Sequence, residues 1–389
     1  MTLPERVLVL GLARSGLAAK AALEARGVEV VGVDRKLGND GDLALLDGVG
    51  LLVKSPGVPG SHPLVETARA REISVWSEVE LGYRLLPEAR FVGVTGTNGK
   101  TTTVELLGEI FRAAGRDVAV AGNVGRPLTE IEPAGWVVCE LSSFQLEDVH
   151  ELACEIAVLL NLEPDHLDRH GSFGAYREAK LRIFERARVA VVPRGLGLAG
   201  IEFSADDPLP AEPRIRGHHN RENAAAATVA ARAAGIGDEA IADALQSFDG
   251  VRHRLELVAE VRRVRYVNDS KATNVAAALR ALEAYADEPV LLIVGGRGKG
   301  ESFAPLAAAI GDNVQAVFAI GETAGELVAA TGERAADAGD LATALVLAAA
   351  AARPGDVVLL SPACASYDQF RDFEHRGEEF RRLVQNLGA

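Results

Sequence analysis

Cysteine, positive charge and long apolar runs are all scarce in this sequence, and each shortage excludes a class of protein. The three cysteines (Cys139, Cys154 and Cys364) are far apart and odd in number. This pattern argues against a disulfide framework or a zinc site and predicts reduced thiols in the core. Basic residues number 41 against 55 acidic ones, and the resulting net charge of −14 opposes non-specific binding to nucleic acid or anionic membranes. No apolar run approaches the roughly 18–20 residues of a membrane span.

Lysine is scarce among the basic residues. Only seven of the 41 are lysines, and four of these, Lys100, Lys180, Lys271 and Lys299, fall in the motifs described below. In such motifs an ammonium or a free amine suits the chemistry. The chain passes directly from a short polar start into a strand-like run at 7–10, so we expect no signal peptide. The sequence predicts a cytoplasmic protein, and we expect a monomer without nucleic-acid or membrane partners.

The length and the apolar periodicity predict several α/β domains. A chain of 389 residues corresponds to two or three domains. Short β-rich apolar runs alternate with longer stretches of helical period, the pattern of α/β domains with parallel sheets. This alternation predicts three units, at 1–88, 89–250 and 251–389. Strands are expected at 6–12, 28–34, 91–96, 135–141, 153–161, 256–261, 264–268, 290–295, 316–321 and 356–361, and helices at 15–26, 176–184 and 220–234.

A glycine turn follows the first predicted strand. The segment Gly11-Leu-Ala-Arg-Ser-Gly16 opens a helix, and Asp34 closes the next strand. Such a turn directs backbone N–H groups and the positive end of the helix dipole at an anionic ligand. Ala13 stands where a dinucleotide-binding fingerprint has its middle glycine, which argues against close approach of a pyrophosphate as in dehydrogenases. The motif predicts an anion site, and an ordinary turn between strand and helix is the alternative.

The segment 91–101 carries the strongest signal. It runs from a strand through Gly96-Thr-Asn-Gly-Lys100-Thr101 into a helix, although Val94 replaces the first glycine of the strict phosphate-loop spacing. The glycines let the main chain fold around phosphates, the lysine reaches the β- and γ-oxygens, and the threonine can ligate Mg²⁺. The strand at 136–140 ends in Glu140, where such folds place a second metal-binding acid. Together these features predict a nucleoside triphosphatase core.

Two clusters later in the second unit are less specific. The segment 161–170 brings acids and imidazoles to a strand end, where ligands bind in α/β sheets, although a solvated loop has the same composition. The predicted helix at 176–184 carries Lys180, which by itself is more typical of a surface position.

The third unit contains three strand-end loops that are dense in polar donors, at 268–274, 295–300 and 361–373. They predict a second substrate with more than one anionic group. The first is also typical of a helix N-cap formed by Asp or Ser. Before them, His253-Arg254 follows the joint between units and either reaches into a nucleotide cleft or pairs with a surface glutamate.

Taken together, these motifs resemble those of the Mur ligase family, in collinear order over almost the whole chain. The segments that carry the resemblance are Gly-Thr-Asn-Gly-Lys-Thr at 96–101, Glu-Leu-Ser-Ser-Phe-Gln-Leu-Glu at 140–147, Asp-His-Leu-Asp-Arg-His at 165–170, Tyr-x-x-x-Lys at 176–180, His-Asn-x-x-Asn at 219–223, His-Arg at 253–254, Asn-Asp-Ser-Lys-Ala-Thr-Asn at 268–274 and Ser-Pro-Ala-Cys-Ala-Ser-x-Asp-Gln-Phe at 361–370.

The resemblance implies an α/β enzyme of three domains. These are a Rossmann-like domain for a UDP-sugar (1–88), a central P-loop ATPase domain (89–250) and a C-terminal Rossmann-like domain for an amino acid (251–389). ATP would phosphorylate the carboxylate of UDP-N-acetylmuramoyl-L-alanine, and D-glutamate would attack the acyl phosphate to give an amide of a peptidoglycan precursor. This chemistry requires neutralisation of phosphate charge and exclusion of water. We expect the third domain to close onto the second before turnover.

The resemblance also implies a role for individual residues. Thr101 and Glu140 would hold a first Mg²⁺, and His166 and Lys180 a second, with Lys180 carbamylated so that its amine becomes a carboxylate-like ligand. Because imidazole is not a preferred Mg²⁺ ligand, we expect His166 to act partly as a partner of phosphate or carboxylate. The implied catalytic residues are Lys100, His166, Lys180, Arg254 and Lys271.

The implied contacts fall into three groups. The ATP contacts are Gly96, Thr97, Asn98, Gly99, Lys100, Thr101, Thr102, Asn223, Arg254, Asp269 and Lys271, with Asn220 nearby. The UDP-sugar contacts are Arg14, Ser15, Lys36, Ser55 and Asn123, and the D-glutamate contacts are Thr273, Lys299, Ser366, Tyr367 and Phe373. The sequence departs from the family pattern at two of these positions, because Arg35 lies beside Lys36 and Tyr367 replaces a commonly aliphatic residue.

Three alternatives follow from the same motifs. Another ligase of this architecture, such as a folylpolyglutamate synthase, would share the phosphate loop and the lysine but lack the first unit. A dinucleotide-dependent oxidoreductase would use the two terminal units, against which Ala13 and the 96–101 loop argue. A nucleotide-driven switch protein would bind ATP without turnover that depends on two further substrates.

Overall fold

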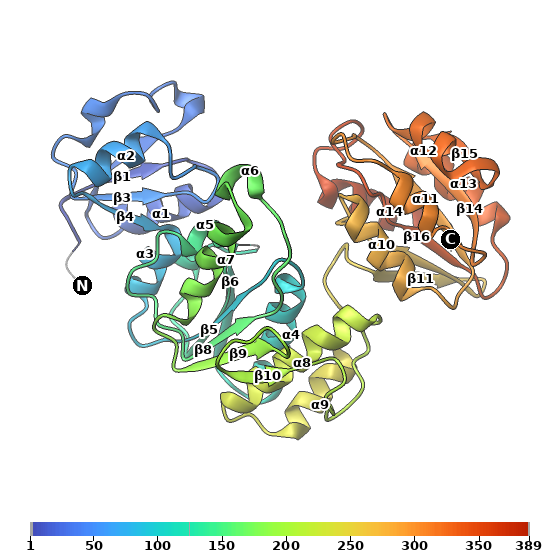
Figure 1. The fold of residues 1–389 in the computed structure, drawn as a ribbon, viewed down its shortest axis with the longest axis horizontal. Helices are drawn as coiled ribbons and strands as arrows, with labels where there is room; N and C mark the ends of the chain where they lie inside the picture. Colours follow the sequence, from blue (N-terminus) through green and yellow to red (C-terminus); the bar gives the residue numbers. More distant parts are fainter. Residues whose placement is uncertain (1–2, 124, 388–389) are drawn as a thin grey trace. The chain divides into compact units, whose positions relative to one another are not determined.

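The computed structural model describes residues 3–123 and 125–387 and has two compact units. The first unit comprises Met1–Arg214 and His219–Phe248, and the second comprises Ile215–His218 and Asp249–Ala389. The first contains two sheets and the second contains one, so the mixed α/β class with parallel sheets is confirmed. The division into three domains at residues 88 and 250 stays a prediction. Each unit is described separately (Figure 1).

The N-terminal sheet of the first unit has four parallel strands in the order β2-β1-β3-β4. Alternate residues of β1 face opposite sides, as the two-residue period of a strand requires. Leu8 and Leu10 pack with α2, whereas Val7 and Val9 pack with α1 and α3. The elements are β1 (Arg6–Leu10), α1 (Arg14–Glu24), β2 (Glu29–Val33), β3 (Leu51–Lys54), α2 (Pro63–Ala70), β4 (Ser74–Ser77) and α3 (Glu78–Leu85).

The second sheet of the first unit has six strands in the order β10-β9-β8-β5-β7-β6, all parallel. Its central strand β5 is buried from Phe91 to Thr95 and leads directly into the predicted phosphate loop. The strands are β5 (Arg90–Thr95), β6 (Val118–Gly122), β7 (Trp136–Glu140), β8 (Ile156–Leu159), β9 (Val189–Pro193) and β10 (Ile201–Phe203). The helices are α4 (Lys100–Ala113), α5 (Ser143–Leu146), α6 (Leu167–His170), α7 (Phe173–Leu181), α8 (His218–Ala233) and α9 (Asp238–Ser247).

The sheet of the second unit has the order β11-β12-β16-β13-β14-β15, in which only β11 runs antiparallel to its neighbour. Helices α10, α11 and α12 cover one face, and α13 and α14 cover the other (Figure 1). The strands are β11 (Glu256–Val261), β12 (Val264–Asn268), β13 (Val290–Gly295), β14 (Val314–Ile320), β15 (Ala335–Gly339) and β16 (Val357–Leu360). The helices are α10 (Val275–Ala284), α11 (Ala304–Ala309), α12 (Ala324–Thr331), α13 (Leu341–Ala351) and α14 (Phe373–Leu387).

The fold tests two predictions, one about the cysteines and one about the N-cap of α10. The three cysteines are free and buried, as expected. The N-cap of α10, however, is Asn274, whose side chain accepts from the backbone N–H of Ala277, so the prediction of Asp or Ser as the cap was wrong. In the described ranges, no helix is long and apolar enough to cross a membrane.

Candidate active site

The predicted phosphate loop connects β5 to α4. Gly96 (φ +155°) and Gly99 (φ +84°) adopt backbone conformations that side chains rarely allow. A Cβ on Gly99 would lie 2.2 Å from Oδ1 of Asn223, so the side chain from α8 lies directly against the loop. Lys100 begins α4, and its Nζ donates to the carbonyl oxygens of Gly96 (2.8 Å) and Thr97 (2.9 Å). Five predicted ATP contacts, four on the loop and Asn223 from α8, therefore lie together here.

Three residues outside the predicted set hold this loop in place. Asn161 accepts from the backbone N–H of Asn98 (2.8 Å), and Glu163 accepts from the Asn98 side chain (2.8 Å). The hydroxyl of Tyr176 lies 3.0 Å from that of Thr97, and burial raises the pKa of the tyrosine to about 12. Asn161 and Glu163 follow strand β8, where ligand-binding loops are common in α/β sheets. Their position directly after a buried strand is the sequence feature from which Asn161 and Glu163 can be predicted as loop-binding residues.

Glu140 lies at the end of β7 and is 2% exposed. Its Oε2 accepts from the Thr101 hydroxyl at 2.8 Å, and its Oε1 accepts from the Asn123 side chain at 3.2 Å. The structure thus joins the two residues predicted for the first metal and one predicted for the UDP-sugar. A hydroxyl and a carboxylate are hard oxygen donors, and Mg²⁺ is usually bound by one or two carboxylates together with substrate phosphates. These residues therefore fit the Mg²⁺ use that the family implies.

Lys180 is buried, which corrects the surface position that its helix alone favours. Its side chain is 2% exposed, and its Nζ donates to the carbonyl oxygen of Gly96 at 2.8 Å. The ammonium also lies 4.7 Å from the centre of the Tyr176 ring. Burial, with the nearby charge of Lys100, lowers the pKa of Lys180 to about 7. The structure thus places a readily neutralised amine against the phosphate loop.

His166 is placed differently from Lys180. It adopts φ +52° at the start of α6, and its side chain is 50% exposed. Its ring lies 3.5 Å from the Asp165 carboxylate and packs against Phe144. In the described ranges, the ion-pair and ring contacts of His166 are with Asp165 and Phe144 rather than with Lys180.

The predicted UDP-sugar contacts gather around the glycine turn of the N-terminal sheet. Ser55 donates to the carbonyl oxygen of Gly11 (2.6 Å), and Asp34 accepts from the backbone N–H groups of Leu12 (2.6 Å) and Lys36 (2.8 Å). These bonds lower the pKa of Asp34, that from Lys36 most strongly. A Cβ on Gly16 would lie 1.8 Å from the Gly11 carbonyl oxygen, so the turn requires glycine there.

The remaining UDP-sugar candidates extend from this turn. Arg14 and Ser15 form the first turn of α1, and Arg14 donates to the carbonyl oxygen of Gly125 at 2.8 Å. Arg35 and the exposed Lys36 share the short helical turn after β2. This placement does not identify which of the two side chains would contact a UDP-sugar.

In the second unit, the predicted residues gather at the carboxyl ends of three adjacent strands, β12, β16 and β13. Asp269 is buried, and its carboxylate accepts from the Ser361 hydroxyl (2.8 Å) and the Leu255 N–H (3.2 Å). Burial raises the pKa of Asp269 to about 7, which the charge of Arg254 opposes. Lys271 lies 5.6 Å from the centre of the Phe373 ring.

The candidate glutamate contacts have different exposures. Thr273 and Phe373 are half-buried, Ser366 is buried and Lys299 is exposed. Tyr367 is 65% exposed. They lie on the three loops that follow β12, β13 and β16 and at the start of α14.

Two family models match the chain. They are "Mur ligase middle domain" at residues 94–195 and "Mur ligase, glutamate ligase domain" at residues 253–364. The fold and the phosphate-loop site are thus those of an ATP-dependent ligase class.

Curated relatives and solved structures agree with this class. An enzyme of Anaeromyxobacter dehalogenans named UDP-N-acetylmuramoylalanine--D-glutamate ligase is 43% identical, with 97% of each chain covered. The enzyme of the same name from Sphingopyxis alaskensis is 42% identical and covers 99% of this chain and 98% of its own. The UDP-N-acetylmuramate-alanine ligase structure from Thermotoga maritima has a TM-score of 0.64 at 19% identity and covers 98% of this chain and 99% of its own. The chain belongs to the Mur ligase family.

Proposed function

We propose that the protein is the ligase that joins D-glutamate to UDP-N-acetylmuramoyl-L-alanine, with ATP as the energy source, in the synthesis of a peptidoglycan precursor. The observation that carries the proposal is the near full-length similarity to enzymes of that name, together with Lys180 and Glu140 at the phosphate loop. ATP would phosphorylate the alanyl carboxylate, and the glutamate amine would attack the acyl phosphate to release phosphate.

The chain's own residues support each part of this reaction. Lys100 and the loop amides would bind the triphosphate, and Thr101 and Glu140 would hold Mg²⁺, which screens the phosphate charge when bound. Arg254 would donate to the γ-phosphate, with Asp269 and Lys271 as further ATP contacts. The remaining ATP contacts and the UDP-sugar and D-glutamate contacts are proposed as in the sequence analysis.

Carbamylation of Lys180 is part of the proposal. Carbamate forms on an uncharged amine, and a pKa of about 7 leaves a large share of Lys180 neutral at physiological pH. The carbamate would supply an oxygen ligand for a second Mg²⁺, with His166 as a partner of phosphate or carboxylate. The Rossmann-like assignment of the two terminal sheets, the P-loop assignment of the central sheet, a cytoplasmic location and a monomeric state are proposed with it.

Folylpolyglutamate synthase is the second candidate. A bifunctional folylpolyglutamate synthase/dihydrofolate synthase structure from Yersinia pestis has a TM-score of 0.57 but covers only 80% of this chain. The D-glutamate ligase is favoured because its relatives match nearly the full length, which includes the N-terminal sheet. The relatives' ligase names also speak against the oxidoreductase and switch alternatives.

The decisive assay measures phosphate release from ATP with UDP-N-acetylmuramoyl-L-alanine, and compares D-glutamate with L-glutamate. We expect release that requires both substrates and the D-isomer. Equal rates with both isomers would overturn the stereospecific assignment, and incorporation of glutamate into a pteroate alone would establish the second candidate.

A further inference from the structure

Arg376, in the first turns of α14, is fully buried, with 0% of its side chain exposed. Its hydrogen-bond partners in the described part of the chain are one hydroxyl and four carbonyl oxygens, none of them charged. Buried charges are usually paired because an isolated charge is costly to remove from water. Burial has the largest effect on the pKa of Arg376 and lowers it to about 10, although the carboxylates of Asp368 and Asp269 act through space to raise that pKa. A buried arginine whose hydrogen-bond partners are all neutral therefore calls for a function beyond packing.

The five bonds reach three different loops. Nε donates to the Ser270 hydroxyl (3.0 Å), and Nη2 donates to the carbonyl oxygens of Ser270 (2.9 Å) and Cys364 (3.1 Å). Nη1 donates to the carbonyl oxygens of Gly295 (3.5 Å) and Ala365 (3.4 Å). These residues lie at the carboxyl ends of β12, β16 and β13, which are neighbours in the sheet. One planar guanidinium thus connects three successive strand-end loops.

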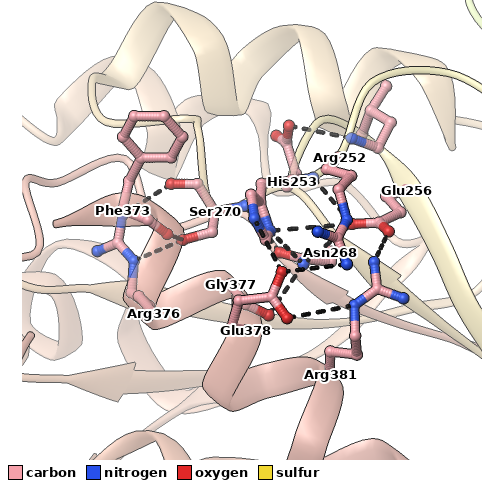
Figure 2. Close-up of polar contacts among 12 residues, drawn as sticks. Arg252, His253, Glu256, Asn268, Ser270, Phe373, Arg376, Gly377, Glu378 and Arg381 are labelled. Carbon is pink, nitrogen blue, oxygen red and sulfur yellow. Dashed lines mark hydrogen bonds and ion pairs between the residues drawn. The ribbon is translucent and has the colours of Figure 1, made fainter. Parts of the chain in front are cut away.

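Two further contacts tighten this junction. The Ser270 hydroxyl donates to the carbonyl oxygen of Phe373 at 2.8 Å, which ties the β12 loop to the start of α14 (Figure 2). A Cβ on Gly296 would lie 2.3 Å from the Ala365 carbonyl oxygen and 3.1 Å from Nη1 of Arg376. The loops approach so closely around the guanidinium that no side chain fits at Gly296.

The same loops carry the proposed glutamate contacts. Ser366 directly follows Ala365, and Thr273 follows Ser270 on one loop. The carbonyl oxygen of Phe373 accepts a hydrogen bond from the Ser270 hydroxyl. Lys299 follows Gly295 on the third loop. In α/β folds, ligands bind at the carboxyl ends of the strands, so the charge of Arg376 lies beneath the edge where an acidic substrate is expected.

We propose that Arg376 is a positioning residue for the acidic amino-acid substrate. It fixes the three loops relative to one another, and it supplies a positive charge that no hydrogen-bonded carboxylate in the described part of the chain neutralises. A glutamate with two carboxylates gains from such a charge in a site of low dielectric constant. The inference rests on the proposed function, because the glutamate contacts are assigned there.

The test compares Arg376→Gln, which removes the charge, with Arg376→Lys, which keeps it but loses the planar fork. Arg382→Gln is the matched control, because this arginine is 59% exposed on the same helix and pairs with Glu379. In the phosphate-release assay, we expect the KM for D-glutamate to rise about tenfold in the Gln variant and less in the Lys variant. The KM for the UDP-sugar substrate should stay within about twofold in both, and the control should match wild type.

The outcomes separate this inference from the proposed function. A D-glutamate KM that is unchanged in the Gln variant, or equal in the Gln and Lys variants, would overturn the inference. If melting curves show that the Gln variant does not fold, Ser270→Ala decides the question, because it removes only the hydroxyl and its two hydrogen bonds, with Nε of Arg376 and with the carbonyl oxygen of Phe373. We expect Ser270→Ala to raise the same KM about threefold, and no change would overturn the inference. Wild-type protein that releases no phosphate with D-glutamate would instead refute the proposed function.

Discussion

Replacement of Lys180 tests the chemistry of the phosphate loop most directly. The folded pKa of about 7 lies roughly 3.5 units below that of a free lysine, which corresponds to about 5 kcal/mol between its two protonation states. At pH 7 about half of the Lys180 side chains are therefore neutral, against roughly one in three thousand for a solvated lysine. Burial thus makes an amine available for carbamylation that would otherwise be almost entirely an ammonium.

Lys180→Arg keeps the charge but cannot be deprotonated, so it cannot form a carbamate. We expect kcat for D-glutamate-dependent phosphate release to fall about 10²- to 10³-fold, the range for loss of one electrostatic group at a reaction centre. Wild-type activity should fall in bicarbonate-depleted buffer and return when bicarbonate is added, and the variant should not respond. Lys20→Arg is the control, because Lys20 forms a surface pair with Glu24. More than a tenth of wild-type kcat in Lys180→Arg would refute the reasoning.

The lowered pKa also predicts a stability effect that does not depend on activity. Between about pH 7 and 10.5 the unfolded chain binds a proton at Lys180 that the folded chain does not. The free energy of unfolding should therefore rise with pH through this window. Lys180→Met should remove that part of the rise in urea unfolding at pH 7 and pH 9.5. An identical rise in the variant would show that the amine is not desolvated.

Three further predictions concern other positions. Glu140→Gln should raise the Mg²⁺ concentration for half-maximal activity about tenfold, because an ionised oxygen donor becomes neutral, and an unchanged requirement would contradict its role. The raised pKa of Asp269 means that the folded chain binds more protons than the unfolded chain between pH 3.8 and about 7, so stability should fall as pH rises there. Asp269→Asn should flatten this fall in urea unfolding at pH 5 and pH 8, and an unchanged slope would exclude Asp269 as its source. Gly377→Ala would place a Cβ 2.1 Å from Nδ1 of His253 and should cost about 1–3 kcal/mol in thermal unfolding. Gly325→Ala in α12 is the control, because a Cβ at Gly325 would have no heavy atom within 4 Å. This substitution should be neutral or stabilise the protein by up to about 1 kcal/mol. Equal effects of the two substitutions on thermal unfolding would argue against the close contact at Gly377.

Local sequence predicted the strands that lead into the phosphate loop and into the loops of the second unit, but it missed the interior strands β3 and β9 as well as several edge strands. Strands such as β5 and β13 are buried apolar runs, and the structure places both at the predicted ranges to within a residue. The edge strands β10 and β15 were not predicted, because one has three residues and the other, Ala-Ala-Asp-Ala-Gly, has no β-branched residue. Their pairing with β9 and β14 depends on tertiary context, which a local pattern does not contain.

The burial of individual charged residues was harder to predict from the sequence than the strands. Lys180 lies on a short amphipathic helix, and its burial depends on the distant loop carbonyl of Gly96 rather than on neighbours in sequence. Arg376 did leave a signal, since it lies on the same helical row as the buried residues Phe380 and Val384. An arginine on the apolar row of a helix is therefore a candidate for a positioning role on the sequence pattern alone.

The two buried cations show how one physical effect gives opposite chemical results. Both Lys180 and Arg376 donate to backbone carbonyl oxygens, and burial lowers the pKa of each, to about 7 and about 10 respectively. The ammonium loses its proton near neutral pH and becomes a nucleophilic amine, whereas the delocalised guanidinium keeps its proton. Burial at the phosphate loop therefore produces a reactive group, and burial beneath the loops of the second unit produces a fixed charge. Arginine at position 180 should abolish the first role because it stays charged, whereas lysine at position 376 should keep the fixed charge and lose only the fork that joins three loops.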